Sequence, residues 1–137
     1  MIFYNGSHQK FYNDNIAKAK KKDGYTKSLI YILGIMEETR NNFTKIYDIE
    51  KNEIIHESIN APFQTSGSIS LTRFAFNLFN DTYFDVCNVE EGKENTPNAI
   101  YYTPVEIFKH WVIMPYLFEA VRLRFNQADE TVQEIDW

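Results

Sequence analysis

Apolar residues recur at helical spacing along the first third of the chain. Residues 8–22 carry a weak stripe made by Phe11, Ile16 and Ala19. Ser7 stands just before it, where a hydroxyl could cap the helix. Residues 28–36 are apolar on nearly every side, and a helical pattern resumes over residues 39–47. Residues 28–36 fit either a central buried helix or a buried strand, and the length of the run with residues 25–27 favours a helix. We therefore predict three helices, with Gly34 permitting close contact with a neighbouring helix.

The helical pattern stops over residues 48–60. A polar stretch at residues 50–53 separates Ile49 from Ile54 and Ile55. Short apolar pieces on either side of a polar turn are typical of a β-hairpin. We therefore predict one small hairpin in a chain that is otherwise helical.

Another helix is predicted to begin near Ser68. Apolar residues follow at helical spacing, namely Leu71, Phe74, Ala75, Leu78 and Phe79. Polar residues at steps of three or four form a narrow strip on the same helix, namely Ser70, Arg73, Asn77 and Asp81. A polar strip on a largely apolar helix is a candidate for chemistry or for contact with a partner.

The start of this helix is the best candidate for a binding site. Exposed amides at a helix N-terminus attract anions, neighbouring hydroxyls add donors, and Arg73 could reach a phosphate or carboxylate. The alternative is structural: Ser66 or Ser68 caps the helix and Arg73 pairs with an acidic neighbour. Of the two, the structural role is favoured. The candidate binding residues are Gln64, Thr65, Ser66, Gly67, Ser68, Arg73 and Asn77.

The strongest local signal in the chain is a helix start at Thr103. Thr103 can cap the helix, Pro104 suits its first position, and Glu106 can close a capping box. Pro115 lacks the N–H that a helix interior needs, so a kink or break is expected near residues 113–114. An apolar stripe along this helix is expected to pack inward, and it comprises Ile107, Trp111, Met114, Phe118, Val121 and Phe125.

These elements predict a mainly α fold. We expect a compact single helical domain over residues 1–125, with one small hairpin, and an acidic C-terminal tail over residues 126–137. A length of 137 residues suits one domain, and eleven Phe, nine Tyr and two Trp supply ample material for its core.

The cysteine content and the lengths of the apolar runs indicate the cellular compartment of the protein. The single cysteine, Cys87, excludes an internal disulfide and fits a reducing compartment. The chain begins without a basic leader, and no apolar run approaches the ~20 residues that a membrane-spanning helix requires. We therefore expect a protein of the bacterial cytoplasm that makes no membrane contact.

Charge is distributed unevenly along the chain. Residues 1–73 carry ten Lys and Arg against eight Asp and Glu, whereas residues 74–137 carry four against eleven. An acidic surface repels phosphates, so no direct nucleic-acid binding is expected, and it suits a protein partner with a basic surface, including a nucleic-acid-binding surface that it could occlude. The alternative is that the acidic charge serves only solubility.

The sequence lacks the signatures of common catalytic and metal sites. The histidines at positions 8, 56 and 110 have no companion at ligand spacing, and Cys87 has no nearby Cys or His pair. No Gly-rich phosphate loop, nucleophile elbow or dinucleotide fingerprint is present. We therefore predict no catalytic residue, no metal and no cofactor, and we expect that the protein is not an enzyme.

Four stretches resemble a known family. They are IFYNGSHQKFY, LIYILGIMEETRNNFTKIYD, FQTSGSISLTRFAFNLFND and YYTPVEIFKHWVIMPYLFEAVRLRF. Together they resemble an uncharacterised domain-of-unknown-function family of short proteins from phages and mobile elements of Gram-positive bacteria. The most specific part is a pattern satisfied by Gln64, Thr65, Ser68, Arg73, Ala75, Phe76, Asn77 and Leu78. Phe63 departs from the pattern, where a Trp is expected, and residues 126–137 extend past the usual end.

This resemblance implies a context rather than an activity. Short accessory proteins of phages and mobile elements often inhibit a host defence enzyme, as anti-CRISPR proteins do, so the leading hypothesis is such an inhibitor. The alternative is a binder of an anionic nucleotide or signalling molecule at the Thr65–Ser68 helix start. An enzyme with its site on the polar strip is a third, weaker hypothesis. The many aromatic residues also make a homodimer reasonable.

Overall fold

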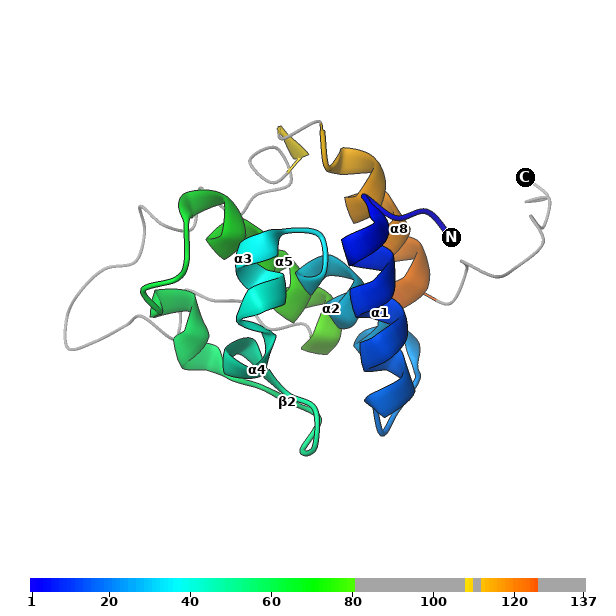
Figure 1. Cartoon of the computed structure of the whole chain (residues 1–137), viewed down its shortest axis with the longest axis horizontal. Coiled ribbons are helices and arrows are strands. Elements are labelled where there is room, and N and C mark those ends of the chain that lie inside the picture. The colour runs from blue at the N-terminus through cyan, green and yellow to red at the C-terminus, as the bar shows by residue number, and fades with distance from the viewer. Residues whose placement is uncertain (81–107, 110–111, 126–137) are drawn as a thin grey trace.

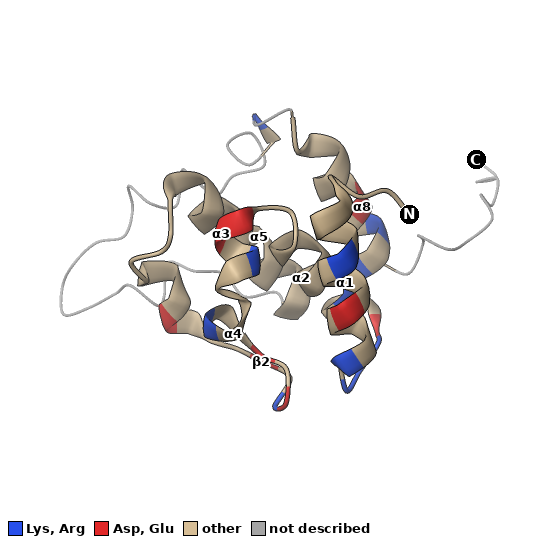
Figure 2. Ribbon diagram, in the orientation of Figure 1, with Lys and Arg blue, Asp and Glu red and all other residues tan. Residues whose placement is uncertain are grey.

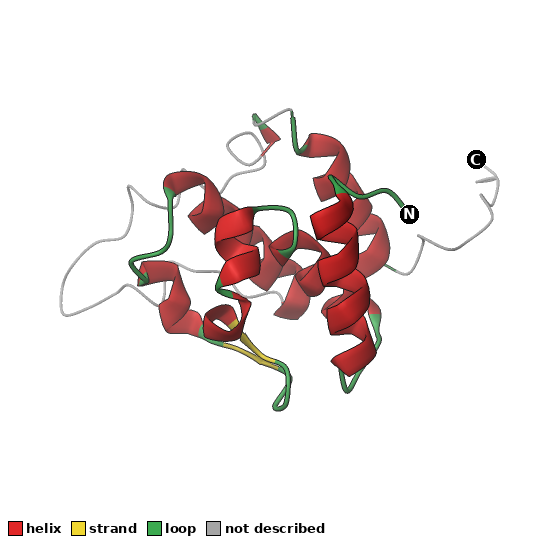
Figure 3. Cartoon of the chain, viewed as in Figure 1, coloured by secondary structure: helices red, strands yellow, loops and turns green. Residues whose placement is uncertain are grey.

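Helix α2 (Gly24–Leu33) is the centre around which the other helices pack (Figure 1). The structure is a computed structural model that describes residues 1–80, 108–109 and 112–125. Its other elements are α1 (Gly6–Lys18), α3 (Glu37–Asn41), α4 (Phe43–Ile46), β1 (Tyr47–Asp48), β2 (Glu53–Ile54), the 3-10 helix η1 (His56–Asn60), α5 (Ser66–Asn80) and α8 (Met114–Arg124). The protein is therefore mainly helical with a small sheet, as predicted (Figure 3).

The central position of α2 follows from its apolar sequence. Asp23 caps the helix by accepting a hydrogen bond from the Thr26 N–H at 2.9 Å, so α2 begins four residues before the predicted start at Ser28. Every residue from Ser28 to Leu33 is buried. Burying a large apolar side chain contributes roughly 1.5–3 kcal/mol, which makes this segment the main source of core stability.

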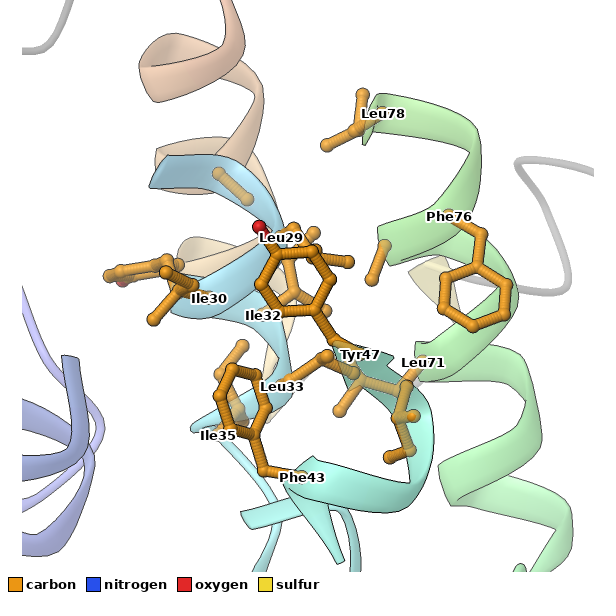
Figure 4. Close-up of a cluster of buried hydrophobic side chains, with 14 of the residues drawn as sticks. Leu29, Ile30, Ile32, Leu33, Ile35, Phe43, Tyr47, Leu71, Phe76 and Leu78 are labelled. Atoms are coloured by element: carbon orange, nitrogen blue, oxygen red, sulfur yellow. The ribbon is translucent and has the colours of Figure 1, made fainter. Parts of the chain in front are cut away.

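The core lies where α5 and α8 pack against α2. Figure 4 shows Leu29, Ile32 and Leu33 of α2 on the side of the cluster that faces Leu71 and Phe76 of α5. Despite its apolar character, α2 has only ten residues. Among the residues that the structure describes, no helix combines the length and the hydropathy needed to cross a membrane.

Gly34 allows α1 to pack closely on the end of α2, as the sequence predicts. A Cβ atom built at Gly34 would lie 2.6 Å from Cδ1 of Phe11 and 2.8 Å from Cδ2 of His8, closer than carbon atoms can approach. Gly24 plays the same part at the other end of the helix, where a Cβ would lie 2.4 Å from the carbonyl oxygen of Arg124. Glycines thus bring both α1 and α8 against α2.

Helix α1 differs from its prediction at both ends and in its buried face. Asn5 caps the helix, because its Oδ1 accepts from the His8 N–H at 2.8 Å, and Ser7 is exposed. The helix ends at Lys18 rather than at residue 22. Its buried residues are His8 and Tyr12, whereas Phe11 and Ile16 are half-buried. His8 and Tyr12 therefore share the inward face with the predicted stripe, of which Ala19 is buried and Phe11 and Ile16 pack against the core.

The hairpin prediction is confirmed with a shift in its strands. Tyr47 pairs with Ile54 and Asp48 with Glu53 in an antiparallel register, so Ile49 belongs to the turn. Asn52 supplies the positive φ of 54° that tightens this turn. The helix expected over residues 39–47 is instead two short helices, α3 and α4, followed by β1.

The predicted break before Pro115 is confirmed, but the predicted inward stripe is wrong at Phe118 and Phe125, while Val121 packs against the core. Helix α8 begins at Met114, with Ile113 as its N-cap and the proline in its first turn. Its buried apolar residues are Leu117, Ala120 and Leu123. Phe118 and Phe125, expected inside, are 51% and 57% exposed. The stripe was drawn through one long helix from residue 103, whereas α8 packs against α2 as a separate helix. The predicted helix start at residue 103 and the side chains at positions 107 and 111 lie outside the described residues.

Candidate functional site

The helix start proposed as a binding site is built as a cap. The Ser68 N–H donates to Oγ1 of Thr65 at 3.1 Å, and the Thr65 N–H donates to Oγ of Ser68 at 2.8 Å. This reciprocal pair is a capping box in which a serine takes the third helical position. Thr65 is therefore the N-cap, whereas the structural interpretation of the sequence had assigned that role to Ser66 or Ser68.

Gln64 ties this cap to the preceding 3-10 helix. Its Nε2 donates to the carbonyl oxygen of Ser58 and to Oγ1 of Thr72, both at 3.2 Å, and its Oε1 accepts from Oγ of Ser68 at 2.6 Å. The Thr72 hydroxyl in turn donates to the carbonyl oxygen of Ser68 at 2.8 Å. The side chains of Gln64, Thr65 and Ser68, three of the candidate binding residues, are thus engaged in a network that joins η1 to the first two turns of α5.

Arg73 and Asn77 do not join the helix start. Arg73 is 5% exposed and Asn77 is exposed, so the predicted polar strip does not form one open surface. Eight residues separate Thr65 from Arg73, which corresponds to about 12 Å along a helix axis. The burial of Arg73 favours a structural role, and anion binding at this turn stays a prediction. Asp81, the last member of the strip, lies outside the described residues.

Gly67, one of the predicted site residues, lines a cavity. The cavity has a volume of about 610 Å³ and lies where the N-terminal segment, α3, the first turn of α5 and residues 109, 112 and 113 meet. Helices α3 and α5 lie side by side here (Figure 1). The described lining residues are Tyr4, Asn5, Ile35, Met36, Glu37, Glu38, Arg40, Gly67, Lys109, Val112 and Ile113.

Charges of both signs line this cavity. Glu37 and Glu38 occupy the first turn of α3, where the helix dipole favours carboxylates. Arg40 and Lys109 supply the positive charges, and Nη1 of Arg40 also donates to the carbonyl oxygen of Gly34 at 2.8 Å. Within the described ranges, no group of three His, Cys, Asp or Glu side chains gathers at a spacing that could hold a metal ion.

His8 is hydrogen-bonded to the backbone of Tyr4, one of the cavity residues, and has a structural role. Its Nδ1 accepts from the Tyr4 N–H at 3.0 Å, and its Nε2 lies 2.7 Å from the carbonyl oxygen of Tyr31, to which it donates. Burial lowers the pKa of His8 from 6.5 to about 4; the hydrogen bond to Tyr31 opposes this change and the charge of Arg40 adds to it. The imidazole is therefore neutral and holds the N-terminal segment against α2.

Sequence reasoning missed most of this cavity. In the sequence Glu37 and Glu38 are an ordinary acidic pair, and nothing connects them with Tyr4 or Lys109. The four positions come from three separate parts of the chain, so no spacing rule brings them together. The weak signal available was Gly67, a flexible residue in the first turn of a helix with an apolar face.

Comparison with known proteins places the whole chain in a single family. A model of the Family of unknown function (DUF6075) matches residues 1–136. The match includes nearly all of residues 126–137, so this segment is part of the family's length and not the extension that the sequence resemblance suggested. No curated protein and no solved structure matches the chain.

Proposed function

The chain belongs to the family of unknown function DUF6075, which assigns it no activity, and we propose that it acts by binding a basic protein surface through its acidic segments. The observation that carries this proposal is the separation of charge along the chain. Residues 81–107 and 126–137 contain ten Asp and Glu against one Lys. The residues that the structure describes contain thirteen Lys and Arg against nine Asp and Glu.

The charges of the described helices differ in arrangement from those of the acidic segments, residues 81–107 and 126–137. Glu119, the single acidic residue of α8, is buried and paired with Arg122 at 2.8 Å, so it offers little to a partner. Charged groups of the described helices are instead scattered over several elements in both signs (Figure 2). Long-range attraction of a basic partner therefore falls to the two acidic segments, whose like charges act together.

The partner that best fits this charge is a nucleic-acid-binding protein. Such a protein presents a basic surface to phosphates, and an acidic segment can occupy that surface in place of the nucleic acid. The resemblance to short proteins of phages and mobile elements supports a host antiviral nuclease as the target, in the manner of an anti-CRISPR inhibitor. Inhibition by occupation requires no catalytic residue, and the target would be met in the bacterial cytoplasm.

The test compares two variants with equal charge changes. The tail variant carries Asp129→Asn, Glu130→Gln, Glu134→Gln and Asp136→Asn; the control carries Asp14→Asn, Glu50→Gln, Glu53→Gln and Glu57→Gln at exposed positions of the described residues. Each protein is immobilised and exposed to a bacterial lysate, and bound proteins are identified by mass spectrometry. We expect a stoichiometric partner on the parent and the control, and its loss from the tail variant.

Salt provides the second measurement. Screening shortens the reach of exposed charges from about 10 Å at 0.1 M to about 3 Å at 1 M, so the partner should elute as salt rises. A partner that remains on the tail variant would contradict the role given to residues 126–137, and a partner that elutes independently of salt would contradict the proposed mechanism. Failure to retain any stoichiometric partner would contradict the proposed function itself.

A further inference from the structure

The cavity beside Gly67 has the dimensions and the composition of a small-molecule site. Its volume of about 610 Å³ lies within the roughly 300–1,000 Å³ of ligand pockets. One part of its wall is apolar and comprises Tyr4, Ile35, Met36, Val112 and Ile113. Tyr4 is held in place by its N–H bond to His8 and by the edge-to-face packing of its ring on Tyr116, with centroids 5.4 Å apart. These two contacts thus fix the position of Tyr4 in the apolar wall.

The charges on the wall distinguish between classes of ligand. A ligand with only negative charge would lie near Glu37 and Glu38, and a ligand with only positive charge would lie near Arg40 and Lys109. Either would meet like charges in a partly enclosed space, where repulsion is stronger than in water. A ligand that carries one charge of each sign avoids both penalties.

Two longer helices add to the positive side of the cavity. Asn5, the N-cap of α1, and Gly67, in the first turn of α5, both line it. Helix N-termini carry partial positive charge and suit a carboxylate. The carboxylates of α3 supply the opposite charge, which suits an ammonium group. These two kinds of group lie on different elements around one cavity.

We propose that this cavity binds a small zwitterion with an apolar side chain, of the class of free apolar amino acids and short apolar peptides. The apolar wall receives the side chain, the carboxylates of Glu37 and Glu38 attract the ammonium group, and the positive groups of the wall attract the carboxylate. This site is separate from the acidic segments and does not depend on the proposed partner binding.

Gly67 offers a way to fill the cavity. A Cβ atom placed on Gly67 would lie 3.5 Å from Cε of Met36, an ordinary contact, so alanine fits there. A phenyl group on that Cβ would extend beyond this contact and occupy space at the cavity wall. Gly67→Phe is therefore the blocking variant and Gly67→Ala its matched control. Glu37→Gln with Glu38→Gln removes the negative charge without changing the shape.

The test is isothermal titration of the full chain with leucine, phenylalanine and the dipeptide leucylphenylalanine. The N-acetylated and C-amidated forms of the dipeptide, octanoate and octylamine serve as comparison probes. We expect at least one zwitterion to bind, and removal of either of its charges to weaken binding by about tenfold or more, as the loss of a charged hydrogen bond does. Octanoate or octylamine binding as tightly as the best zwitterion would overturn the proposal.

The variants locate the binding. Gly67→Phe should abolish binding and Gly67→Ala should retain it, while the double glutamine variant should bind about tenfold more weakly. Thermal melts establish that each variant is folded, and the glutamine variant decides the matter if Gly67→Phe is not. Unchanged affinity in the glutamine variant, or no binding of any zwitterion to the parent at millimolar concentration, would overturn the site. Neither result would alter the partner capture that tests the proposed function.

Discussion

His8 shows how one buried side chain couples the N-terminus of this protein to its central helix. Both ring nitrogens are used: one accepts from the backbone of Tyr4 and the other donates to the backbone of Tyr31. A second proton on the ring would leave two donors, Nδ1–H and the Tyr4 N–H, pointing at each other. The burial and the bonding of His8 therefore both favour the neutral ring.

The stability of the protein should consequently fall in mild acid. The pKa of His8 is about 4 in the folded chain and near 6.5 in the unfolded chain. Between pH 6.5 and 4, His8 is therefore protonated in the unfolded state and mostly neutral in the folded state. The free energy of unfolding should decrease as pH falls from 6.5 to 4, by up to about 3 kcal/mol. Urea melts across this range, compared with those of His8→Gln, measure the effect.

His8→Gln provides the control because it removes this titration and keeps the carboxylates. Its unfolding free energy should change less between pH 6.5 and 4 than that of the parent, whatever its absolute value. Parallel pH profiles for the two proteins would show that His8 is not the group responsible.

At the scale of the element, the start of α5 depends on the pair formed by Thr65 and Ser68. Thr65→Ala removes the hydroxyl that accepts from the Ser68 N–H and should lower the free energy of unfolding by about 1 kcal/mol. Ser66→Ala, one residue later and exposed, should change it by less than about 0.5 kcal/mol. Denaturant titration of both variants measures the difference, and equal effects would mean that Thr65 is not the cap.

The elements also show where local sequence is sufficient and where it fails. The break before Pro115 and the hairpin at residues 47–54 were predicted because a missing N–H and a polar turn act on their immediate neighbours. The buried face of α8 was not, because it depends on which side of that helix meets α2. Phe118 lies on the predicted stripe and yet is half exposed, because α8 packs against α2 with the face that contains Leu117.

At the scale of the whole molecule, two exposed aromatic residues are consistent with the predicted homodimer. Phe118 and Phe125 lie seven residues apart on α8 and are each more than half exposed. Large exposed apolar side chains on a small protein often mark an interface. We expect light scattering to give the mass of two chains, and Phe118→Ser with Phe125→Ser to give the mass of one. A parent that scatters as a monomer at high concentration would contradict this prediction.

The candidate cavity belongs to the same scale, and the sequence supplied only one of its residues. Of the seven positions predicted for a binding site, Gly67 alone lines it. The polar spacing around Arg73 made it a candidate to face a ligand, although a structural role was favoured, and the packing of α5 buries its side chain. Spacing along a helix gives the relative directions of side chains but does not say which direction faces solvent.

By itself, the sequence determined the class of fold, most of the helices, the hairpin and the uneven charge of the chain. These properties follow from the spacing of apolar residues, from turn and cap chemistry and from simple counting, all of which act over a few residues. Only the tertiary structure decided that His8 and Arg73 are buried, that Phe118 and Phe125 are exposed and that Gly67 lines one cavity with Glu37 and Lys109. Those facts depend on contacts between residues far apart in the chain, where packing around α2 overrides local preference.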